Sequence, residues 1–369
     1  MKKRVLHFYG EGSIGGKEKA QIELLRSFLN DQDYEFGVAI LRDRGPLIED
    51  IRKLGIPTLV LNLKNGFDFN FKKELLTEFR KYDIHHLHDP SPNTIIYSLL
   101  GGNEIKRVFT RRGGISECKT LKQIVKFHFK KILIKSFFDG FSGNSTNAVK
   151  SVVEQYKISN HNVFLLHNSV PIENLKPSIP RESVLSLLGL QKDDFIIGGS
   201  GKFIDLKRFE ILLVAISLIK DFPLKLILLG DGKNKFKYYE IIHKHQLTDK
   251  VIFPGYIKDI ANYLQIMDCF VMPSDNRESF GNSLVEAMYF KIPSIIMNDS
   301  SGLKDHIIDQ STGYVVSDVK ELSERIKLIK ADQSKAQEVG LQAHKYVLSK
   351  YSTENLINNY KCFYNSLFA

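Results

Sequence analysis

The sequence has 369 residues, 43% of them hydrophobic and 25% charged, and a net charge of +10. This composition is ordinary for a soluble globular protein and leaves enough chain for two domains. No run of 18 apolar residues is present, which excludes a membrane-spanning helix, and the three cysteines lack metal-binding spacing. The excess of Lys predicts an anionic partner: nucleic acid, anionic lipid or a phosphorylated substrate. A general bias toward Lys, Ile and Asn accounts for part of this excess.

The first apolar run, residues 5–9, is too short for the apolar segment of a secretion signal and is typical of a strand. Together with the sparse cysteines, it predicts a cytoplasmic protein, either free or at the inner face of the cytoplasmic membrane. A glycine-rich segment, 10–16, follows the strand and precedes a helix over 18–30. A loop in this position can approach a phosphate. Its glycines match neither the dinucleotide-binding pattern G-x-G-x-x-G nor a Walker A loop.

Strands and helices then alternate along the first half of the chain. Strand-like runs occur at 36–41, 58–63, 84–87, 107–110, 140–143 and 163–166. Helical patterns lie between most of them, at 46–54, 71–81, 92–100, 119–137 and 147–156. This alternation predicts an α/β fold with a doubly wound parallel sheet.

A cluster of prolines, Pro171, Pro177 and Pro180, indicates a linker, and a second alternating series follows it. Its strands are expected at 195–199, 224–230, 251–253, 269–272, 294–297 and 313–316. Its helices are expected at 207–220, 234–246, 258–265, 282–290 and 318–330. The last stretch, 335–368, is predicted to be helical with a break near Ser352. The sequence therefore predicts two similar α/β halves.

The stretch 275–294 combines two glutamates with a helix start. A loop after the strand at 269–272 leads into a helix whose N-cap we expect at Asn282 or Ser283, next to Gly281. Free N–H groups there can bind an anion, and ligands of open α/β sheets bind beyond the carboxyl ends of strands. Glu278 and Glu286 can accept hydrogen bonds from sugar or ribose hydroxyls. The alternative is an acidic helix start that only complements the helix dipole.

Two lysines, Lys202 and Lys207, lie across the strand-to-helix turn after residues 195–199. Both can converge on one diphosphate and neutralise charge on a leaving group. The alternative is a solvated basic loop. Gly230 and Tyr256 follow the next two strands, and they form either part of a nucleobase pocket or simple turns.

His85, His86 and His88 end a strand of the first half, and Arg111 and Arg112 end the next. The guanidinium groups suit phosphate or carboxylate. Alternation along the strand turns His85 away from the other two and leaves no further ligand, so we expect a polar active-site wall and no metal. The only D-x-D motif, at 31–33, falls at the wrong end of the sheet for a metal site. No nucleic-acid-binding motif is present, so we expect no nucleic-acid partner.

The helix at 119–135 is basic and amphipathic. Lys119, Lys122, Lys126 and Lys130 share one face, and a second face carries Leu121, Ile124, Val125, Phe129 and Ile132. Such a helix can lie on an anionic membrane. The alternative is an ordinary surface helix whose apolar face packs into the core.

Taken together in chain order, these pieces resemble a retaining GT-B glycosyltransferase of glycosyltransferase family 4, the glycosyl transferases group 1. The matching stretches are Gly15-Gly16, 166–171, Gly201-Lys202 with Lys207, 228–232, 253–255, 268–274, Glu278 with Glu286-Ala-Met, and 311–315. The resemblance implies two Rossmann-like domains facing a cleft, with the C-terminal helix returning to the N-terminal domain. It places the acceptor domain at 1–170 plus 352–369, and the nucleotide-sugar domain at 171–351.

The resemblance also implies roles. Lys202, Lys207, Glu278, Arg112 and His88 are expected to be catalytic, with Gly15 and Arg111 on the acceptor side. The donor site is expected to comprise Gly16, Gly201, Gly230, Tyr256, Phe280, Gly281, Asn282, Ser283 and Glu286. No cofactor and no divalent metal are expected. Several positions depart from the family pattern: Arg112 stands where many members have His, Arg208 replaces a common Gly, and Ser301-Gly302 with Asp305 replaces a Gly-Gly turn followed by Glu.

The predicted function is retaining transfer of a sugar from a nucleotide-diphosphate sugar to a glycan, the EC 2.4 type of reaction. The expected acceptor is lipid-linked, such as lipopolysaccharide core, O-antigen, capsule or exopolysaccharide, at an anionic membrane surface bound through 119–135. Two alternatives stay open at this point. One is a nucleotide-sugar epimerase of the same fold, and the other is a non-catalytic subunit that binds a nucleotide sugar.

Overall fold

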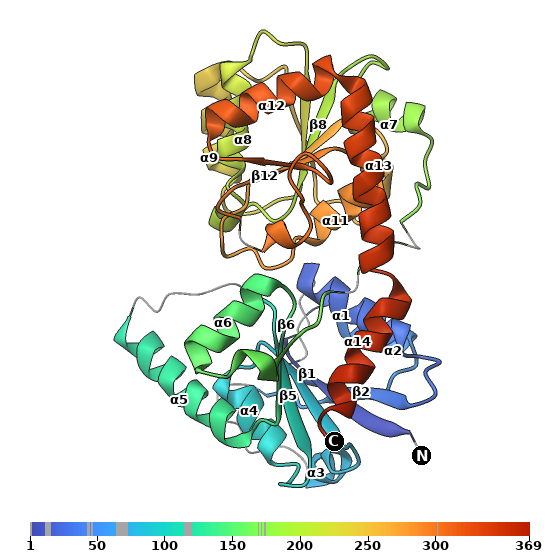
Figure 1. The fold of residues 1–369 in the computed structure, drawn as a ribbon, viewed down its shortest axis with the longest axis vertical. Helices are drawn as coiled ribbons and strands as arrows, with labels where there is room; N and C mark the ends of the chain where they lie inside the picture. The colour runs from blue at the N-terminus through green and yellow to red at the C-terminus, as the bar shows by residue number, and fades with distance from the viewer. Residues whose placement is uncertain are drawn as a thin grey trace. The chain divides into compact units, whose positions relative to one another are not determined.

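The computed structural model describes residues 2–11, 16–42, 45, 47–63, 73–113, 120–168, 170, 172, 175–300 and 302–369 (Figure 1). The chain forms two compact units. The first comprises Met1–Ser169 and Thr353–Ala369, and the second comprises Val170–Ser352. The boundaries predicted from the sequence differ from these by one residue. The functional roles predicted for the two domains stay predictions.

The first unit is built on a sheet of seven parallel strands in the order β3-β2-β1-β4-β5-β6-β7. They are β1 (Lys3–Glu11), β2 (Tyr34–Arg42), β3 (Thr58–Val60), β4 (Ile84–His88), β5 (Lys106–Arg111), β6 (Gly140–Gly143) and β7 (Val163–Leu165). Most of these strands are buried along their length, because helices cover both faces of the sheet.

The helices of this unit divide between the two faces. They are α1 (Gly16–Ser27), α2 (Leu47–Lys53), α3 (Lys73–Phe79), α4 (Pro92–Leu99), α5 (Leu121–Phe137), α6 (Thr146–Tyr156) and α14 (Thr353–Asn365). One apolar cluster joins the sheet to α1, α2 and α14. A second cluster joins the opposite face to α3, α4, α5 and α6. Figure 1 shows these two groups of helices on the two sides of the sheet.

The second unit has six parallel strands in the order β10-β9-β8-β11-β12-β13. They are β8 (Ile196–Ser200), β9 (Lys225–Leu229), β10 (Val251–Gly255), β11 (Cys269–Met272), β12 (Ser294–Met297) and β13 (Tyr314–Val316). The two parallel sheets confirm the predicted α/β class.

Its helices also cover both faces of the sheet. They are α7 (Arg181–Leu187), α8 (Phe209–Leu218), α9 (Lys235–His245), α10 (Ala261–Leu264), α11 (Asn282–Tyr289), α12 (Val319–Ala331) and α13 (Gln333–Lys350). Helices α8, α9 and α12 share one apolar cluster, and α7, α10 and α11 share the other. Helix α7 was missing from the sequence-based prediction. The segment that leads into α7 is bonded to α10, because the backbone N–H of Ser178 donates to Asn262 Oδ1 at 2.7 Å.

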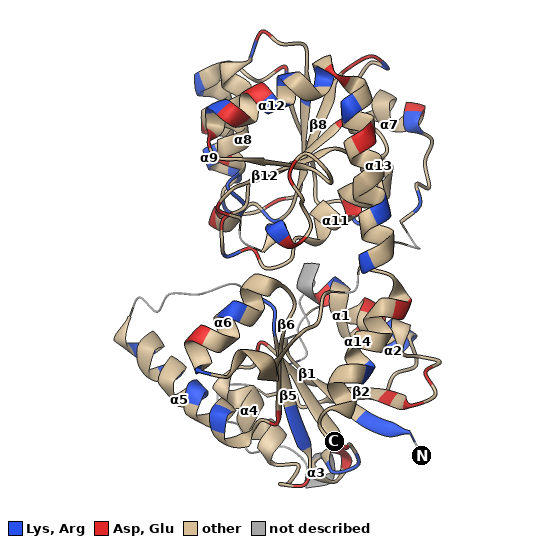
Figure 2. Ribbon diagram, viewed as in Figure 1, with Lys and Arg blue, Asp and Glu red and all other residues tan. Residues whose placement is uncertain are grey.

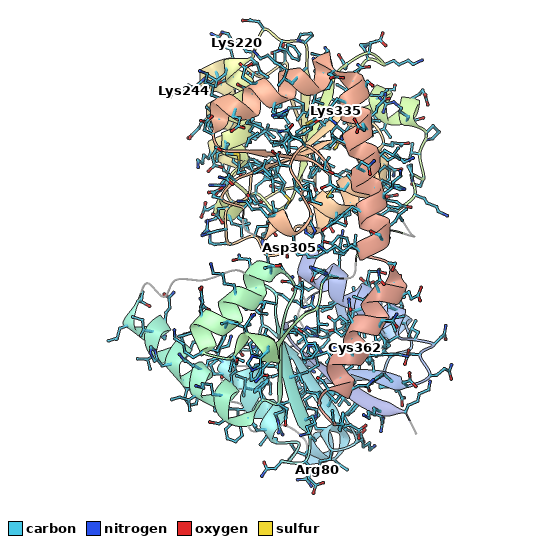
Figure 3. All side chains as sticks on the ribbon, viewed as in Figure 1. Arg80, Lys220, Lys244, Asp305, Lys335 and Cys362 are labelled. Atoms are coloured by element: carbon cyan, nitrogen blue, oxygen red, sulfur yellow. The ribbon has the colours of Figure 1, made fainter. Side chains whose placement is uncertain are left out.

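The last helix, α14, returns to the first unit, as predicted. Leu356, Tyr360, Phe363 and Tyr364 contribute to the core of that unit. Beside these apolar contacts, Lys361 Nζ lies 2.7 Å from a carboxylate oxygen of Asp31 and 2.6 Å from one of Asp33. The D-x-D motif therefore has a structural partner, because both of its carboxylates bind the C-terminal helix. Figure 3 labels Cys362 on the exposed side of the same helix.

Each sheet reverses its strand order at one point. In the second unit the reversal lies between β8 and β11, and in the first it lies between β1 and β4. In open α/β sheets the loops beyond the carboxyl ends of such neighbouring strands diverge and leave room for a ligand. The loops that follow these four strands are therefore where a site is expected on fold grounds alone.

Candidate functional site

The second unit brings Lys207 and Glu278 together at its reversal point. Lys207 comes from the short 3-10 helix Asp205–Lys207 that follows β8, and Glu278 comes from the loop after β11. Lys207 Nζ lies 2.6 Å from Glu278 Oε2, and the two side chains are only 13% and 15% exposed. An ammonium and a carboxylate in this setting supply a cation for phosphate and an acceptor for sugar hydroxyls.

Glycines let the neighbouring loops approach this pair closely. Gly201 has a φ of +153°, and a Cβ added there would lie 2.9 Å from Lys207 Cε. Gly230 has a φ of +144°, and its Cβ would lie 2.0 Å from the Gly201 carbonyl oxygen. Both glycines were predicted site residues. The structure places them side by side at the ends of β8 and β9, next to Lys207.

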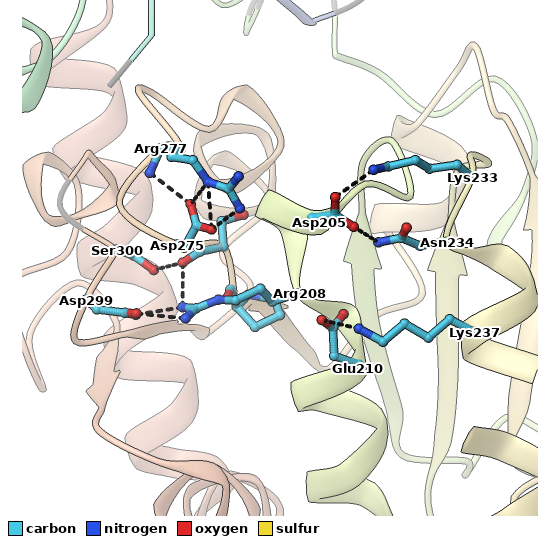
Figure 4. Close-up of polar contacts among 12 residues, drawn as sticks. Asp205, Arg208, Glu210, Lys233, Asn234, Lys237, Asp275, Arg277, Asp299 and Ser300 are labelled. Carbon is cyan, nitrogen blue, oxygen red and sulfur yellow. Dashed lines mark hydrogen bonds and ion pairs between the residues drawn. The ribbon is translucent and has the colours of Figure 1, made fainter. Parts of the chain in front are cut away.

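Arg208 ties together three loops at this edge of the sheet (Figure 4). Its guanidinium donates to the carbonyls of Pro273 (2.9 Å) and Ser274 (3.1 Å), and to both oxygens of Asp299 (2.6 and 2.7 Å). Asp275, beside Ser274, also binds Arg277, which holds the pKa of Asp275 below its ordinary value against the opposing effect of burial. The loops after β8, β11 and β12 thus form one connected rim.

The start of α11 differs from the prediction. The N-cap is Gly281, with a φ of +71°, so the helix begins at Asn282 and neither Asn282 nor Ser283 is the cap. A Cβ on Gly281 would clash with Leu303, and only glycine fits both the space and the backbone angle. Glu286 is the fifth helical residue, one or two residues further into the helix than the predicted caps imply. Ser283 Oγ donates to the carbonyl of Ser200 at 3.2 Å, which joins α11 to the end of β8.

Phe280 is held in place by a histidine that no sequence pattern singled out. The Phe280 side chain is buried in the core, which leaves only its backbone for a ligand. His306 Nε2 lies 2.6 Å from the Phe280 carbonyl oxygen, and His306 Nδ1 bonds to the hydroxyl of Tyr351. The nearby Gly302 lies against the backbone of Glu278 and Ser279, with no space for a Cβ. The loop that carries Glu278 is therefore supported along its inner side.

The remaining predicted residues of this unit lie around the same edge. Lys202 is exposed and directly follows Gly201. Tyr256 is 66% exposed and directly follows Gly255, whose carbonyl accepts from the Gly230 N–H at 2.8 Å. Glu286 is half-buried in the second turn of α11.

In the first unit, the reversal point holds a buried histidine cluster. His7, on β1, lies with its Nδ1 3.0 Å from His88 Nε2. His86, also on β4, contacts the hydroxyls of Tyr364 and Thr110, each at 2.7 Å. His85 points to the other face, toward Ser98 and Phe79, as its strand position predicted. Burial and the nearby Arg112 lower the pKa of His7 to about 3, so this imidazole stays neutral.

The three imidazoles His7, His86 and His88 have ligand atoms within 4.8 Å of one another, a spacing that a metal ion could bridge. The hydrogen bonds already formed argue for a different use. Arg112 Nε donates to His88 Nδ1 at 3.1 Å, so a neutral His88 carries its proton on Nε2 and donates it to His7 Nδ1. His86 has both nitrogens bonded to hydroxyls. Within the described residues, a hydrogen-bond chain therefore runs from Arg112 through His88 to His7, and His7 Nε2 is the one ring nitrogen of the three histidines without a partner.

Arg112 itself is buried, and each nitrogen of its guanidinium donates to a protein group. Besides His88, its guanidinium donates to Asn168 Oδ1 at 2.6 Å and to the Tyr360 hydroxyl at 3.3 Å. Within the described part of the chain, no carboxylate is bonded to the Arg112 guanidinium. Its predicted role in catalysis stays a prediction, and the geometry shows that it links β4, the segment after β7, and α14.

The other predicted residues of this unit lie in different surroundings. Arg111 is mostly buried, with Nη1 3.7 Å from Asp89 Oδ1 and Nε bonded to the Gly113 carbonyl at 3.0 Å. Gly16 begins α1. Gly15 and Lys119 lie outside the described residues, and so does Ser301.

The sequence reasoning missed four residues that support the site: His7, Asn168, Arg208 and His306. Asn168 falls inside the stretch 166–171 that carried part of the resemblance, so a signal for it was present. Arg208 was noted as a departure from a common Gly, and its φ of +46° explains why Gly is common there. His7 and His306 carried no local signal, because their partners lie 81 and 26 residues away.

Known proteins resemble this chain in sequence and in fold. Residues 184–346 match the family described as Glycosyl transferases group 1. The poly(ribitol-phosphate) alpha-N-acetylglucosaminyltransferase of Staphylococcus aureus (strain COL) is 25% identical over 219 residues, which are 58% of this chain and 41% of that protein. The N-acetylgalactosamine-N,N'-diacetylbacillosaminyl-diphospho-undecaprenol 4-alpha-N-acetylgalactosaminyltransferase of Campylobacter jejuni is 26% identical over 263 residues, or 66% of this chain and 68% of that protein.

Among solved structures, Anabaena Alr3699/HepE in complex with UDP has a TM-score of 0.84 and 18% identity, covering 99% of this chain and 100% of that one. The chain spans less than half of the length of the first curated relatives that it matches. Within the described residues, no helix is long and apolar enough to cross a bilayer. By sequence and by fold, the chain is similar to glycosyltransferases of the GT-B type.

Proposed function

We propose that this chain, whose residues 184–346 match the glycosyl transferases group 1, moves a sugar from a nucleotide-diphosphate sugar to a glycan acceptor. The observation that carries the proposal is the Lys207–Glu278 pair at the reversal point of the second sheet. A diphosphate needs a fixed cation, and a donor sugar needs a fixed acceptor of hydroxyl hydrogen bonds. Both groups are present, mostly buried, and positioned by glycine-lined loops.

The donor site follows from these positions. Lys207 and the exposed Lys202 neutralise the diphosphate, and the positive end of the α11 dipole adds to the field. Glu278 accepts from the sugar hydroxyls, and Glu286 accepts from the ribose. The complex of Anabaena Alr3699/HepE with UDP supports a nucleotide diphosphate as the ligand class.

Lys207 is paired with Glu278 in the structure, so donor binding is an exchange of partners. The diphosphate takes the ammonium, and the released carboxylate turns to the sugar. Lys207 and Glu278 therefore both contact the donor only when its diphosphate and its sugar are bound together. Transfer then rests on positioning and on stabilisation of the leaving diphosphate by the two lysines, with retention of the anomeric configuration and without a divalent metal.

We place the acceptor on the first unit, where His88, Arg111 and Arg112 line the reversal point. The names of relatives that act on ribitol phosphate polymers and on a diphospho-undecaprenol glycan support a phosphate-containing or lipid-linked glycan as acceptor. The reaction would take place in the cytoplasm, at the inner face of the cytoplasmic membrane.

A two-stage experiment tests the proposal. A thermal-shift panel of nucleotide sugars first identifies the donor. A ligand at a hundred times its Kd should raise the free energy of unfolding by about 2.7 kcal/mol, which corresponds to roughly 5–10 °C for a unit of this size. Transfer of the labelled sugar to glycolipid extracts, with and without EDTA, then follows. Stabilisation by no nucleotide sugar would refute the proposal. Epimerised donor without acceptor would identify an epimerase, and binding without any turnover would identify a binding subunit.

A further inference from the structure

Helix α5 begins and ends in a well-defined way but touches the core with few residues. Its start is closed by a capping box, in which Thr120 accepts from the Gln123 backbone and Gln123 reaches back to the Thr120 N–H. Only Leu133 and Ile134 of its apolar side chains are buried, and Phe127 is partly buried against the same cluster. The helix lies beside α4 and α6. The unit thus uses only a short part of one face of α5.

A second apolar face of α5 points to solvent. Leu121, Val125 and Ile132 are 76%, 60% and 62% exposed, and Ile124 and Phe129 are also exposed. These five side chains have spacings of 3, 4, 8 and 11 residues from the first, so they share one side of the helix. The buried pair Leu133 and Ile134 lies on the opposite side. The alternative that this apolar face packs into the core is therefore wrong.

Lysines flank the exposed stripe, and no acidic residue interrupts it. Lys122 and Lys126 lie along one edge of the stripe by helical position, and Lys131 and Lys135 lie along the other. Residues 101–150 contain eleven Lys and Arg against three Asp and Glu, a net charge of +8 out of +10 for the chain. Figure 2 shows α5 with basic residues and without a single acidic one. Part of the charge counted over residues 101–150 lies elsewhere, since Arg107 and Arg112 are buried, but α5 itself carries five lysines and no acidic residue.

We infer that this face of α5, defined by Leu121, Ile124, Val125, Phe129 and Ile132 with their flanking lysines, docks on an anionic lipid bilayer. The apolar stripe enters the boundary between headgroups and acyl chains, while the lysines stay at the level of the anionic headgroups. A second copy of the chain is a poor occupant, because pairing would set the lysines of one helix against those of the other. The inference deepens the proposed function by naming a partner, but vesicle binding can be measured without turnover.

The test is co-flotation of the full chain with vesicles of pure phosphatidylcholine and with vesicles containing phosphatidylglycerol at about a third of the lipid. We expect at least tenfold tighter binding to the anionic vesicles, and weaker binding as salt is raised. The variant L121S/V125S/I132S should lose at least tenfold in affinity. The variant K122Q/K126Q/K135Q should lose about a hundredfold, since each lysine near an anionic surface contributes about fivefold.

Matched controls exist on the second unit. Leu187, Leu218 and Phe236 are exposed apolar residues outside α5, so L187S/L218S/F236S should leave vesicle binding unchanged. The control for charge is K220Q/K244Q/K335Q, which removes three lysines that Figure 3 labels. This variant should also leave vesicle binding unchanged. Every variant should keep its nucleotide-sugar thermal shift, which separates folding from docking.

Several outcomes would overturn the inference. Equal affinity for both vesicle types, no binding, or an equal loss in the control variants would each do so. A concentration-dependent dimer that L121S/V125S/I132S abolishes would assign the face to a second copy instead. If the transferase proposal fails, no nucleotide sugar will stabilise the protein in the thermal-shift panel, while vesicle binding stays unaffected.

Discussion

Arg208 is a residue whose backbone and side chain have opposite effects on stability. Its φ of +46° lies in the left-handed region, which costs a non-glycine residue about 1 kcal/mol. Its guanidinium recovers that cost by joining Pro273, Ser274 and Asp299. Glycine would suit the backbone and lose the bridge. The strained backbone is thus accepted at a position whose side chain joins three loops.

The two effects can be separated by substitution. R208G removes the strain and the bridge, whereas R208A removes the bridge and keeps the strain. We expect R208A to be destabilised by about 1–3 kcal/mol, and R208G by about 1 kcal/mol less than R208A. Urea unfolding of both variants measures this order. Equal stability of the two variants would contradict it, and both should raise the KM for donor because the loops are loosened.

Lys207 and Glu278 make a second prediction at this scale. K207A should weaken nucleotide-diphosphate binding about 10- to 100-fold, the contribution of one hydrogen bond to a charged group. E278Q frees the Lys207 ammonium, so it should bind the free nucleotide diphosphate at least as tightly as the wild type while losing sugar transfer. Calorimetry and turnover assays read the two effects separately. Weaker nucleotide binding by E278Q would refute the exchange of partners proposed for this pair.

At the scale of the element, β4 packs histidines against both of its faces. Burial lowers the pKa of His7 on the neighbouring β1 and of His85 on β4 to about 3, against an unfolded value of 6.5. Both are neutral in the folded state, so the unfolded chain binds more protons between pH 6.5 and 3. Stability should therefore be complete above pH 6.5 and fall on acidification below it, by up to about 1.4 kcal/mol per pH unit for each histidine.

The pH effect has its own control. Urea unfolding between pH 7 and 5 should show this slope, and His85→Gln should reduce it by one proton although the variant is less stable overall. His161→Gln, at an exposed position, is the matched substitution for comparison. A slope unchanged by His85→Gln would show that this residue is not buried neutral.

Helix α14 gives a further prediction for an element. Lys361 is only 24% exposed and binds both Asp31, which is 7% exposed, and Asp33. Its two carboxylate partners raise the pKa of Lys361, and these contacts lower the pKa of Asp31 against the opposing effect of burial. K361A should destabilise the first unit by about 1–2 kcal/mol. K335A, which breaks the exposed pair with Glu338, should cost clearly less than K361A because exposed ion pairs contribute little. Similar losses in both variants would mean that α14 is not fixed through Lys361.

At the scale of the whole molecule, the sequence predicted the elements better than their partners. The buried parallel strands β6, β11 and β12 were predicted to the residue, and β11 and β12 are short, largely apolar runs bounded by polar turns. Strand β3 is shorter than predicted, since Asn62 takes a φ of +52°. Helix α7 was missed because it follows Pro180, and prolines there indicated a linker. These errors are local and leave the topology unchanged.

The candidate site was predictable in its residue types but not in its connections. Lys207, Glu278 and the glycines could be named because strand ends and loop residues mark a ligand edge in any such sheet. The contact between Lys207 and Glu278 could not be predicted, since it depends on β8 and β11 being neighbours. The same holds for Arg112, whose partners His88, Asn168 and Tyr360 come from three separate segments. The amphipathic character of α5 was visible, but which of its faces meets the core was not.

The return of α14 sets the order in which the two units can be completed during synthesis. The second unit ends at Ser352, whereas the first needs Leu356, Tyr360, Phe363 and Tyr364 to close its core. A ribosome therefore releases all of the second unit before the unit that it began first can finish folding. Throughout that interval the part of the N-terminal sheet that α14 covers, beside α1 and α2, stays open. The N-terminal unit of a nascent chain therefore needs chaperone protection until α14 has been made. A stop codon just before α14 damages the N-terminal unit rather than the C-terminal one.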